Sequence, residues 1–108
     1  EAVIVSGHLS PKDPGSLVDW PALARLRGTL VLLMAVDRLP EIVTSLVTGG
    51  RDPDVPAAII ENGALPGERV IETHLSDLAD AVAREGVRPP AIVIIGGVVS
   101  EREGRKLL

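Results

Sequence analysis

Short runs of aliphatic residues, each ending in residues suited to a loop, recur along the chain. Runs of this length that are bounded by Gly, Pro, Asn or Asp are typical of buried β-strands. The pattern predicts strands at residues 2–5, 29–34, 56–61, 68–74 and 91–95. Asn62-Gly63, which readily adopts positive φ, and Leu65-Pro-Gly67 form a turn between the third and fourth strands. So short a connection indicates antiparallel neighbours.

The segment from Asp37 to Thr48 has the spacing of an amphipathic helix. Its apolar residues, which fall on one helical face, are those at positions 39, 42, 43, 46 and 47. Asp37 is the predicted N-cap, and Pro40 lies within the first turn, where its missing N–H is harmless. Gly49-Gly50 is expected to end the helix.

Two shorter helices are predicted on either side of this one. The first covers residues 19–26, with Asp19 as its N-cap and Gly28 beyond its end. The second covers residues 77–85, with Ser76 as its N-cap and Gly86 as its stop. The buried stripe of the second helix is predicted to contain Leu78, Ala79, Val82 and Ala83.

The alternation of strands and helices, with one added antiparallel strand, predicts an α/β fold. We expect a two-layer or three-layer sandwich in which helices flank a mixed sheet of about five strands. With 108 residues, the chain forms one domain over its whole length. Because it opens on a strand-like run from Glu1 to Val5 without an initiator Met, we expect it to be a piece of a longer protein.

Composition excludes several classes of function. The net charge of −4, together with a single Trp and no Phe or Tyr, argues against nucleic-acid binding, which needs clustered cations and stacking rings. The apolar runs are far shorter than the roughly 20 residues of a membrane span, and no signal-peptide pattern begins the chain. The absence of Cys excludes disulfides and thiolate metal sites and fits a reducing compartment, so we expect a cytoplasmic protein.

Individual polar residues give weak signals of chemistry. His8 and His74 could share a metal only with carboxylates, and the spacing of Asp13, Asp19 and Asp77 matches no metal motif, so none is predicted. His74 is interpreted as a surface residue, and His8 as a loop residue with a structural hydrogen bond or a substrate contact. Ser6-Gly-His8 lacks the pattern of a nucleophile elbow.

Four further features allow a structural or a functional reading. Gly96-Gly97 is interpreted as a tight turn, because no dinucleotide or P-loop motif accompanies it. Arg51, beside Asp52 and Asp54, is expected in a solvated turn with a local ion pair, the alternative being a substrate clamp. Glu61 is either a site residue or the end of a strand, and Trp20 is a core or interface anchor.

Taken together and in order, several segments resemble the C-terminal half of the tetrapyrrole (corrin/porphyrin) methylase family, most closely its uroporphyrinogen-III C-methyltransferases. The resemblance covers nearly the whole chain. The segments that carry it are Val5-Ser-Gly-His8, Asp19-Trp20, Thr29 to Met34, Leu39-Pro40, Gly50 to Asp54, Pro56 to Gly63, Pro66 to Val70 and Pro90 to Val99. Where relatives often have Met-Gly, this chain has Met34-Ala35.

The resemblance implies an enzyme that transfers methyl groups from S-adenosylmethionine to uroporphyrinogen III, giving precorrin-2 for siroheme or cobalamin. It implies a homodimer whose catalytic groups belong mainly to an N-terminal subdomain that this chain lacks, so that the chain alone is expected to be inactive and to self-associate. By motif, the cofactor contacts carried over are Met34, Gly63 and Ala91. Met34 would otherwise be interpreted as a core gap-filler.

Two alternatives to this function stay open. The chain could be the C-terminal domain of another precorrin methyltransferase, acting at a different ring position. It could also be a non-catalytic ligand-binding or dimerisation domain of mixed α/β type, because ligands of such sheets commonly bind at the ends of the strands.

Overall fold

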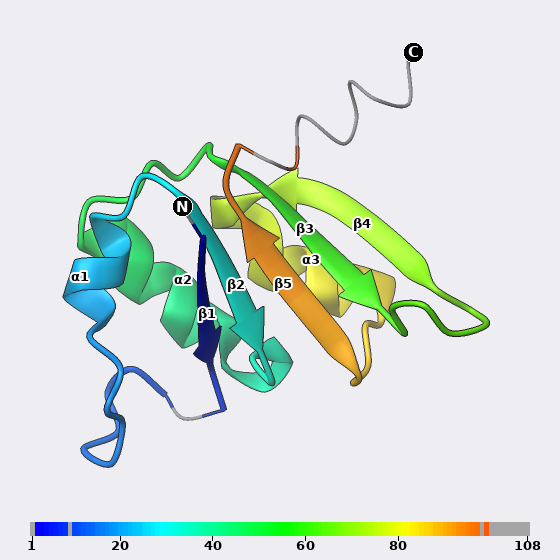
Figure 1. The fold of residues 1–108 in the computed structure, drawn as a ribbon, viewed down its shortest axis with the longest axis horizontal. Helices are drawn as coiled ribbons and strands as arrows, with labels where there is room; N and C mark the ends of the chain where they lie inside the picture. The colour runs from blue at the N-terminus through cyan, green and yellow to red at the C-terminus, as the bar shows by residue number, and fades with distance from the viewer. Residues whose placement is uncertain (1, 9, 98, 100–108) are drawn as a thin grey trace.

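The computed structural model describes residues 2–8, 10–97 and 99. The charged tail over residues 101–108 lies outside them. All five predicted strands are present among the described residues (Figure 1). In chain order the elements are β1 (Ala2–Ser6), α1 (Trp20–Ala24), β2 (Thr29–Leu33), the 3₁₀ turn η1 (Val36–Arg38), α2 (Leu39–Thr48), β3 (Pro56–Glu61), β4 (Arg69–His74), the 3₁₀ turn η2 (Leu75–Asp77), α3 (Leu78–Glu85) and β5 (Ala91–Ile95).

The five strands form one mixed sheet in the order β1-β2-β5-β3-β4. β1 and β2 are parallel, and β3 and β4 form the predicted antiparallel hairpin. β5, the last strand in sequence, lies between β2 and β3 and runs antiparallel to both. The carboxyl ends of β1, β2 and β3 therefore lie at the same edge of the sheet as the start of β5.

The helices cover one face of the sheet, which makes the fold a two-layer sandwich (Figure 1). Alternate strand residues, such as Leu32, Val93 and Ile59, are paired in register and have no exposed surface. They pack against Leu39, Ile42 and Leu46 of α2, Leu75 of η2 and Leu78 of α3. Aliphatic side chains thus supply nearly the whole core, as the composition predicts.

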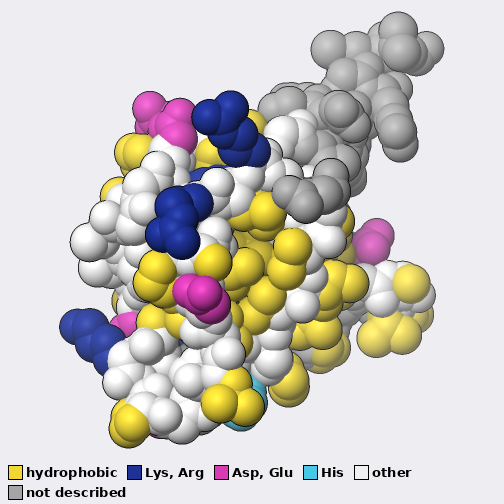
Figure 2. Space-filling model, turned by 60° about the vertical axis from the view of Figure 1, so that its left-hand side comes forward, with side chains coloured by type: hydrophobic (Ala, Val, Ile, Leu, Met, Phe, Trp, Pro, Cys, Tyr) yellow, Lys and Arg dark blue, Asp and Glu magenta, His cyan; other side chains and the backbone are white. Residues whose placement is uncertain are grey.

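The opposite face of the sheet is apolar, and α1, α2 and α3 do not cover it. The row Ile4, Val31, Ile94 and Ala58 crosses four strands, and its exposure falls from 68 % at Ile4 to 3 % at Ala58, which is buried. Figure 2 brings the β1 side of the sheet forward and shows hydrophobic side chains gathered over much of the surface in view. An apolar face of this kind is typical of a surface that packs against further protein. No helix in the described part of the chain is long and apolar enough to cross a membrane.

The first helix confirms one predicted cap and corrects its end. The Asp19 Oδ1 atom accepts a hydrogen bond from the Ala22 N–H at 3.1 Å, as expected of an N-cap. The helix nevertheless ends at Ala24, before Gly28, because the Arg25 N–H already bonds to the Ala22 carbonyl. The chain beyond Arg25 is held by the side chain of Arg51, which binds the carbonyls of Leu26 and Gly28.

The predicted N-caps Asp37 and Ser76 are wrong. Each lies inside a 3₁₀ turn, η1 or η2, that leads into the following helix, and neither helix has a side-chain cap. In η1 the Arg38 N–H bonds to the Ala35 carbonyl at 2.9 Å, so a backbone turn replaces the expected side-chain cap. The predicted ends of both helices, at Gly49-Gly50 and at Gly86 with φ 62°, are correct.

The buried face of α2 agrees with prediction, whereas that of α3 is shifted. In α3 Ala81 has no exposed surface and Ala83 is exposed, although Leu78, Ala79 and Val82 contact the core as predicted. The observed stripe of Leu78, Ala81 and Val82 follows the i, i+3, i+4 spacing of a buried helical face. The predicted stripe omitted Ala81 and included Ala83, which lies outside this face.

Arg51 is buried, which contradicts the solvated turn predicted for it. Arg51 is 8 % exposed, and its guanidinium donates hydrogen bonds to the carbonyls of Leu26 and, at 3.0 Å, of Gly28. Burial lowers the pKa of Arg51, yet arginine stays charged at neutral pH. The neighbouring turn is as predicted, because Asp52 and Asp54 are exposed and Asp52 Oδ1 accepts the Asp54 N–H.

Trp20 lies in the core, 3 % exposed, which confirms the core reading of this residue. His74 is exposed at the end of β4, also as predicted. The chain is also closely packed at Gly7, where a Cβ atom would lie 2.7 Å from the Cβ of Ala35 and 3.0 Å from Ile42 Cδ1. Gly7 thereby lets the chain after β1 pack against Ala35.

We expect Arg51→Met to lower the free energy of unfolding by about 2–3 kcal/mol, because it leaves two carbonyl oxygens without their charged donor. Urea denaturation of the protein measures the change. Arg27→Met, at an exposed arginine of the same α1–β2 connection, is the matched control and should change stability by less than about 0.5 kcal/mol. Equal effects of the two substitutions would contradict a structural role for Arg51.

We expect Gly7→Ala to cost about 1–3 kcal/mol of stability, because the new methyl group overlaps the buried side chains of Ala35 and Ile42. Removing the opposing methyl in the double variant Gly7→Ala/Ala35→Gly should recover part of the loss. Thermal melting of the two variants checks both expectations. A double variant no more stable than Gly7→Ala would show that the Ala35 contact is not the cause.

Candidate functional site

A cavity of about 610 Å³ opens at the edge of the sheet where the carboxyl ends of β1, β2 and β3 meet the start of β5. Ligands of α/β sheets commonly bind at such an edge. Its size is within the range of small-molecule sites. The cavity is lined by His8, Leu33, Met34, Val36, Asp37, Arg38, Ile60, Gly63, Leu65, Pro89, Pro90, Ala91 and Ile92.

The three residues predicted as cofactor contacts all line this cavity. Met34 follows β2, Gly63 lies in the turn after β3, and Ala91 is the first residue of β5. They are distant in the sequence and are brought together because β5 pairs with both other strands. Leu33, Ile60 and Ile92 form an apolar floor between them, on the sheet face that the helices leave uncovered.

Met34 is a cavity residue and not the core gap-filler that its type alone suggests. Its backbone has a φ of 55°, a conformation that is uncommon outside Gly, and the residue is 65 % exposed. This left-handed residue turns the chain so that Ala35 enters the core while Met34 stays at the cavity. Strain of this kind is concentrated at functional sites, and the sequence gives no sign of it here.

The turn after β3 also differs in detail from prediction. Positive φ angles fall on Asn62 and Ala64 rather than on Gly63. The Ala64 N–H donates to Glu68 Oε1 at 3.2 Å and the Leu65 N–H to the Asn62 carbonyl at 2.9 Å, which fixes the turn. Gly63 is exposed within it, so the absence of a side chain leaves room for a ligand to approach the backbone.

The ionisable side chains that line the cavity are His8, Asp37 and Arg38. The His8 ring shares a hydrogen bond of 3.0 Å with Ser6, and the Arg38 Nε donates to the His8 carbonyl at 3.4 Å. The predicted structural hydrogen bond of His8 is thus present, and the residue also reaches the cavity. Arg38 was not singled out in the sequence, because only the contact with the loop after β1 brings it to the site.

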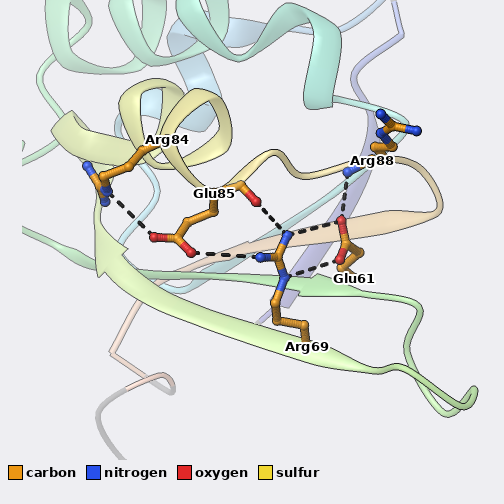
Figure 3. A network of polar contacts seen from close by, with 5 residues as sticks. All are labelled: Glu61, Arg69, Arg84, Glu85 and Arg88. Atoms are coloured by element: carbon orange, nitrogen blue, oxygen red, sulfur yellow. Dashed lines mark hydrogen bonds and ion pairs between the residues drawn. The ribbon is translucent and has the colours of Figure 1, made fainter.

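Glu61 is the last residue of β3 and belongs to a polar network beside the cavity, in which Arg69 joins it to Glu85 (Figure 3). Its carboxylate accepts hydrogen bonds from the Arg88 N–H at 2.7 Å and from Arg69. The hydrogen bond from the Arg88 backbone, followed by the contact with Arg69, holds the pKa of Glu61 below its usual value and outweighs desolvation. Arg69 also contacts Glu85, and the sequence pattern indicated neither contact.

The described residues contain no group of three or more His, Asp or Glu side chains that could hold a metal ion. Apart from its charged rim, the cavity is apolar, with strand-end backbone at its edges. This arrangement suits a flat, largely apolar ligand with polar edges, such as a nucleoside.

Comparison with known proteins gives a consistent result. Residues 1–79 match the family of tetrapyrrole (corrin/porphyrin) methylases. A siroheme synthase of Pseudoalteromonas translucida is 43 % identical over 96 residues, which cover 89 % of this chain and 20 % of that protein. An S-adenosyl-L-methionine-dependent uroporphyrinogen III methyltransferase of Methanosarcina barkeri is 37 % identical over 95 residues, 88 % of this chain and 37 % of that protein.

A crystal structure of a Thermus thermophilus uroporphyrin-III C-methyl transferase, complexed with S-adenyl homocysteine, has the same fold. It superposes with a TM-score of 0.76 at 37 % identity, over 93 % of this chain and 43 % of that one. The chain thus spans between about a fifth and two-fifths of the length of these relatives. The match over residues 1–79 and the shared fold show that the chain belongs to the tetrapyrrole (corrin/porphyrin) methylase family.

Proposed function

We propose that the chain is the C-terminal subdomain of an S-adenosylmethionine-dependent uroporphyrinogen-III C-methyltransferase, which converts uroporphyrinogen III to precorrin-2 for siroheme or cobalamin. Residues 1–108 supply one wall of the cofactor cleft, and an N-terminal subdomain outside this chain supplies the other. The observation that carries the proposal is the convergence of Met34, Gly63 and Ala91 on one cavity at the strand ends. Two of the proteins named above, from Methanosarcina barkeri and Thermus thermophilus, are named as methyltransferases of uroporphyrinogen III or uroporphyrin III.

The cavity fits the adenosine part of the cofactor. Its floor of Leu33, Ile60 and Ile92 offers an apolar surface to a flat ring, and the Met34 thioether can pack on that ring. Gly63 and Ala91 carry little or no side chain, so their backbone groups can approach the polar edges of the ligand. When bound, S-adenosylmethionine supplies the activated methyl group.

Catalysis in this proposal depends on positioning and electrostatics, and no metal takes part. The acid–base groups belong to the N-terminal subdomain, so the chain by itself is inactive. His8 has a loop-ordering role, supported by its hydrogen bond to Ser6, and with Arg38 it presents polar groups to the carboxylates of the tetrapyrrole.

The whole protein is proposed to be a cytoplasmic homodimer. The uncovered apolar face of the sheet, with Ile4 68 % exposed, supports contact with further protein, either the N-terminal subdomain or a second subunit. Without such a partner, the chain alone is expected to self-associate, which light scattering at increasing concentration measures.

The activity is tested by incubating the full-length protein with S-adenosylmethionine and uroporphyrinogen III and analysing the product by mass spectrometry and NMR. Formation of precorrin-2 supports the proposal. Methylation at other ring positions would instead identify another precorrin methyltransferase. Failure to bind the demethylated cofactor product, S-adenosylhomocysteine, would favour a non-catalytic domain.

In the full-length protein we expect Gly63→Val to weaken binding of S-adenosylhomocysteine by about tenfold or more, about 1.4 kcal/mol, because two methyl groups enter the cofactor cavity. The fold should tolerate the change, since a Cβ at Gly63 has Ile60 Cγ2 as its nearest neighbour at 3.4 Å, an ordinary contact. Calorimetric titration measures the affinity.

The matched control for this substitution is Gly97→Val. Gly97 is exposed beyond the other end of β5, and a Cβ there meets no atom within 4 Å. The control variant should bind S-adenosylhomocysteine as the unmodified protein does. Unchanged affinity in Gly63→Val would remove Gly63 from the cofactor site.

A further inference from the structure

Glu61 lies between two walls of the cavity without lining it. Ile60 and Gly63, on either side of it in sequence, are lining residues, and its register partner in β5 is Ala91, a lining residue of the opposite wall. Its register partner in β4 is Arg69. A side chain in this position can act on the shape of the cavity without touching a ligand.

The wall on the β5 side is formed by a segment that lacks backbone donors. Pro89 and Pro90 line the cavity and have no N–H to give to a neighbouring strand. The Arg88 N–H is therefore the last backbone donor before β5. It donates to Glu61 Oε2 at 2.7 Å, so a side-chain carboxylate takes the place of a strand carbonyl (Figure 3).

A second hydrogen bond joins the same two walls. The Asn62 N–H donates to the Pro90 carbonyl at 2.9 Å. The turn after β3 and the segment before β5 are thus tied at two consecutive residues of β3 and its turn, Glu61 and Asn62. Of these two contacts, only the one made by Glu61 can be removed by changing a side chain.

Arg69 holds the Glu61 carboxylate in place. Its Nε and Nη2 atoms lie 3.2 and 3.4 Å from the two Glu61 oxygens. Its Nη2 also donates to the Glu85 carbonyl at the end of α3 at 2.8 Å, and its Nη1 lies 3.7 Å from Glu85 Oε1. Since the Glu61 side chain is only 13 % exposed, these charged donors replace the water that the carboxylate loses.

We propose that Glu61 is a positioning residue for the cofactor: its carboxylate, oriented by Arg69, holds the Arg88–Pro90 segment against the end of β3 and so sets the separation of the Gly63 and Ala91 walls. The inference rests on the proposed binding of S-adenosylmethionine in this cavity. It predicts that substitution of Glu61 lowers the affinity for the cofactor more than it changes the stability of the fold or the KM for the tetrapyrrole.

The test compares Glu61→Ala and Glu61→Gln in the full-length protein by calorimetric titration with S-adenosylhomocysteine. We expect Glu61→Ala to weaken binding by about tenfold, since it removes the charged acceptor of the Arg88 N–H. Glu61→Gln should weaken it less, because the amide oxygen can still accept that bond. The KM for the tetrapyrrole should stay within about twofold of the unmodified value, a change under roughly 0.4 kcal/mol.

Arg84→Ala is the matched control, because Arg84 belongs to the same network but, within the described part of the chain, pairs with Glu85 at 3.6 Å and not with Glu61, and its side chain is 61 % exposed. It should leave the affinity for S-adenosylhomocysteine unchanged. Thermal melting of all variants, with titrations made well below the lowest melting temperature, ensures that only folded protein is measured. Glu61→Gln keeps the size of the side chain and serves as the second variant if Glu61→Ala does not fold.

Two results would overturn the inference. One is an unchanged affinity for S-adenosylhomocysteine in the folded Glu61 variants. The other is an equal loss of cofactor affinity and of tetrapyrrole KM, which would reduce Glu61 to a general structural role. If the unmodified full-length protein does not bind S-adenosylhomocysteine, the proposed function itself fails. This result differs from a failure of the inference about Glu61, which is seen only when the unmodified protein binds and the variants bind equally well.

Discussion

The pairing of β5 with β2 on one side and β3 on the other is the interaction on which the site depends. Because β5 runs antiparallel to both, its first residue, Ala91, lies among the carboxyl ends of the other strands. This arrangement places Ala91 near Met34 and Gly63, although more than twenty residues separate any two of them in the sequence. Because β5 is antiparallel, its first residue forms a wall of the cavity at the carboxyl edge of the sheet. A parallel strand in the same position would place its first residue at the opposite edge.

Three local devices convert this edge into a cavity. The left-handed conformation of Met34 directs Ala35 into the core and leaves Met34 at the surface, where it lines the cavity together with Leu33, Ile60 and Ile92. Gly7 allows the loop after β1 to pack against Ala35, which brings His8 to the rim. Glu61 joins the turn after β3 to the segment before β5. Each of these residues fixes the position of backbone at the cavity. In the proposed function, the backbone N–H and carbonyl groups there contact the nucleoside.

The rest of the molecule supports this edge from behind. α1, α2 and α3 pack on one face of the sheet, and the cavity floor belongs to the opposite face. Arg51 performs a comparable task away from the site, because its buried guanidinium satisfies two carbonyls of the α1–β2 connection. The chain has a single aromatic residue, and contacts between aliphatic side chains are not directional. Charge-assisted hydrogen bonds such as those of Arg51 add directional contacts to this core.

The sequence by itself determined the elements: all five strands, the ends of α2 and α3 and the cap at Asp19 follow from short-range periodicity and from Gly, Pro and Asp chemistry. The ordered resemblance also singled out Met34, Gly63 and Ala91. Only the tertiary structure decided the strand order, the burial of Arg51, the positive φ of Met34 and the contacts of Glu61 with Arg69 and Arg88. The reason is physical: strand and helix patterns reflect neighbours a few residues apart, whereas these features depend on partners that the fold brings from distant segments.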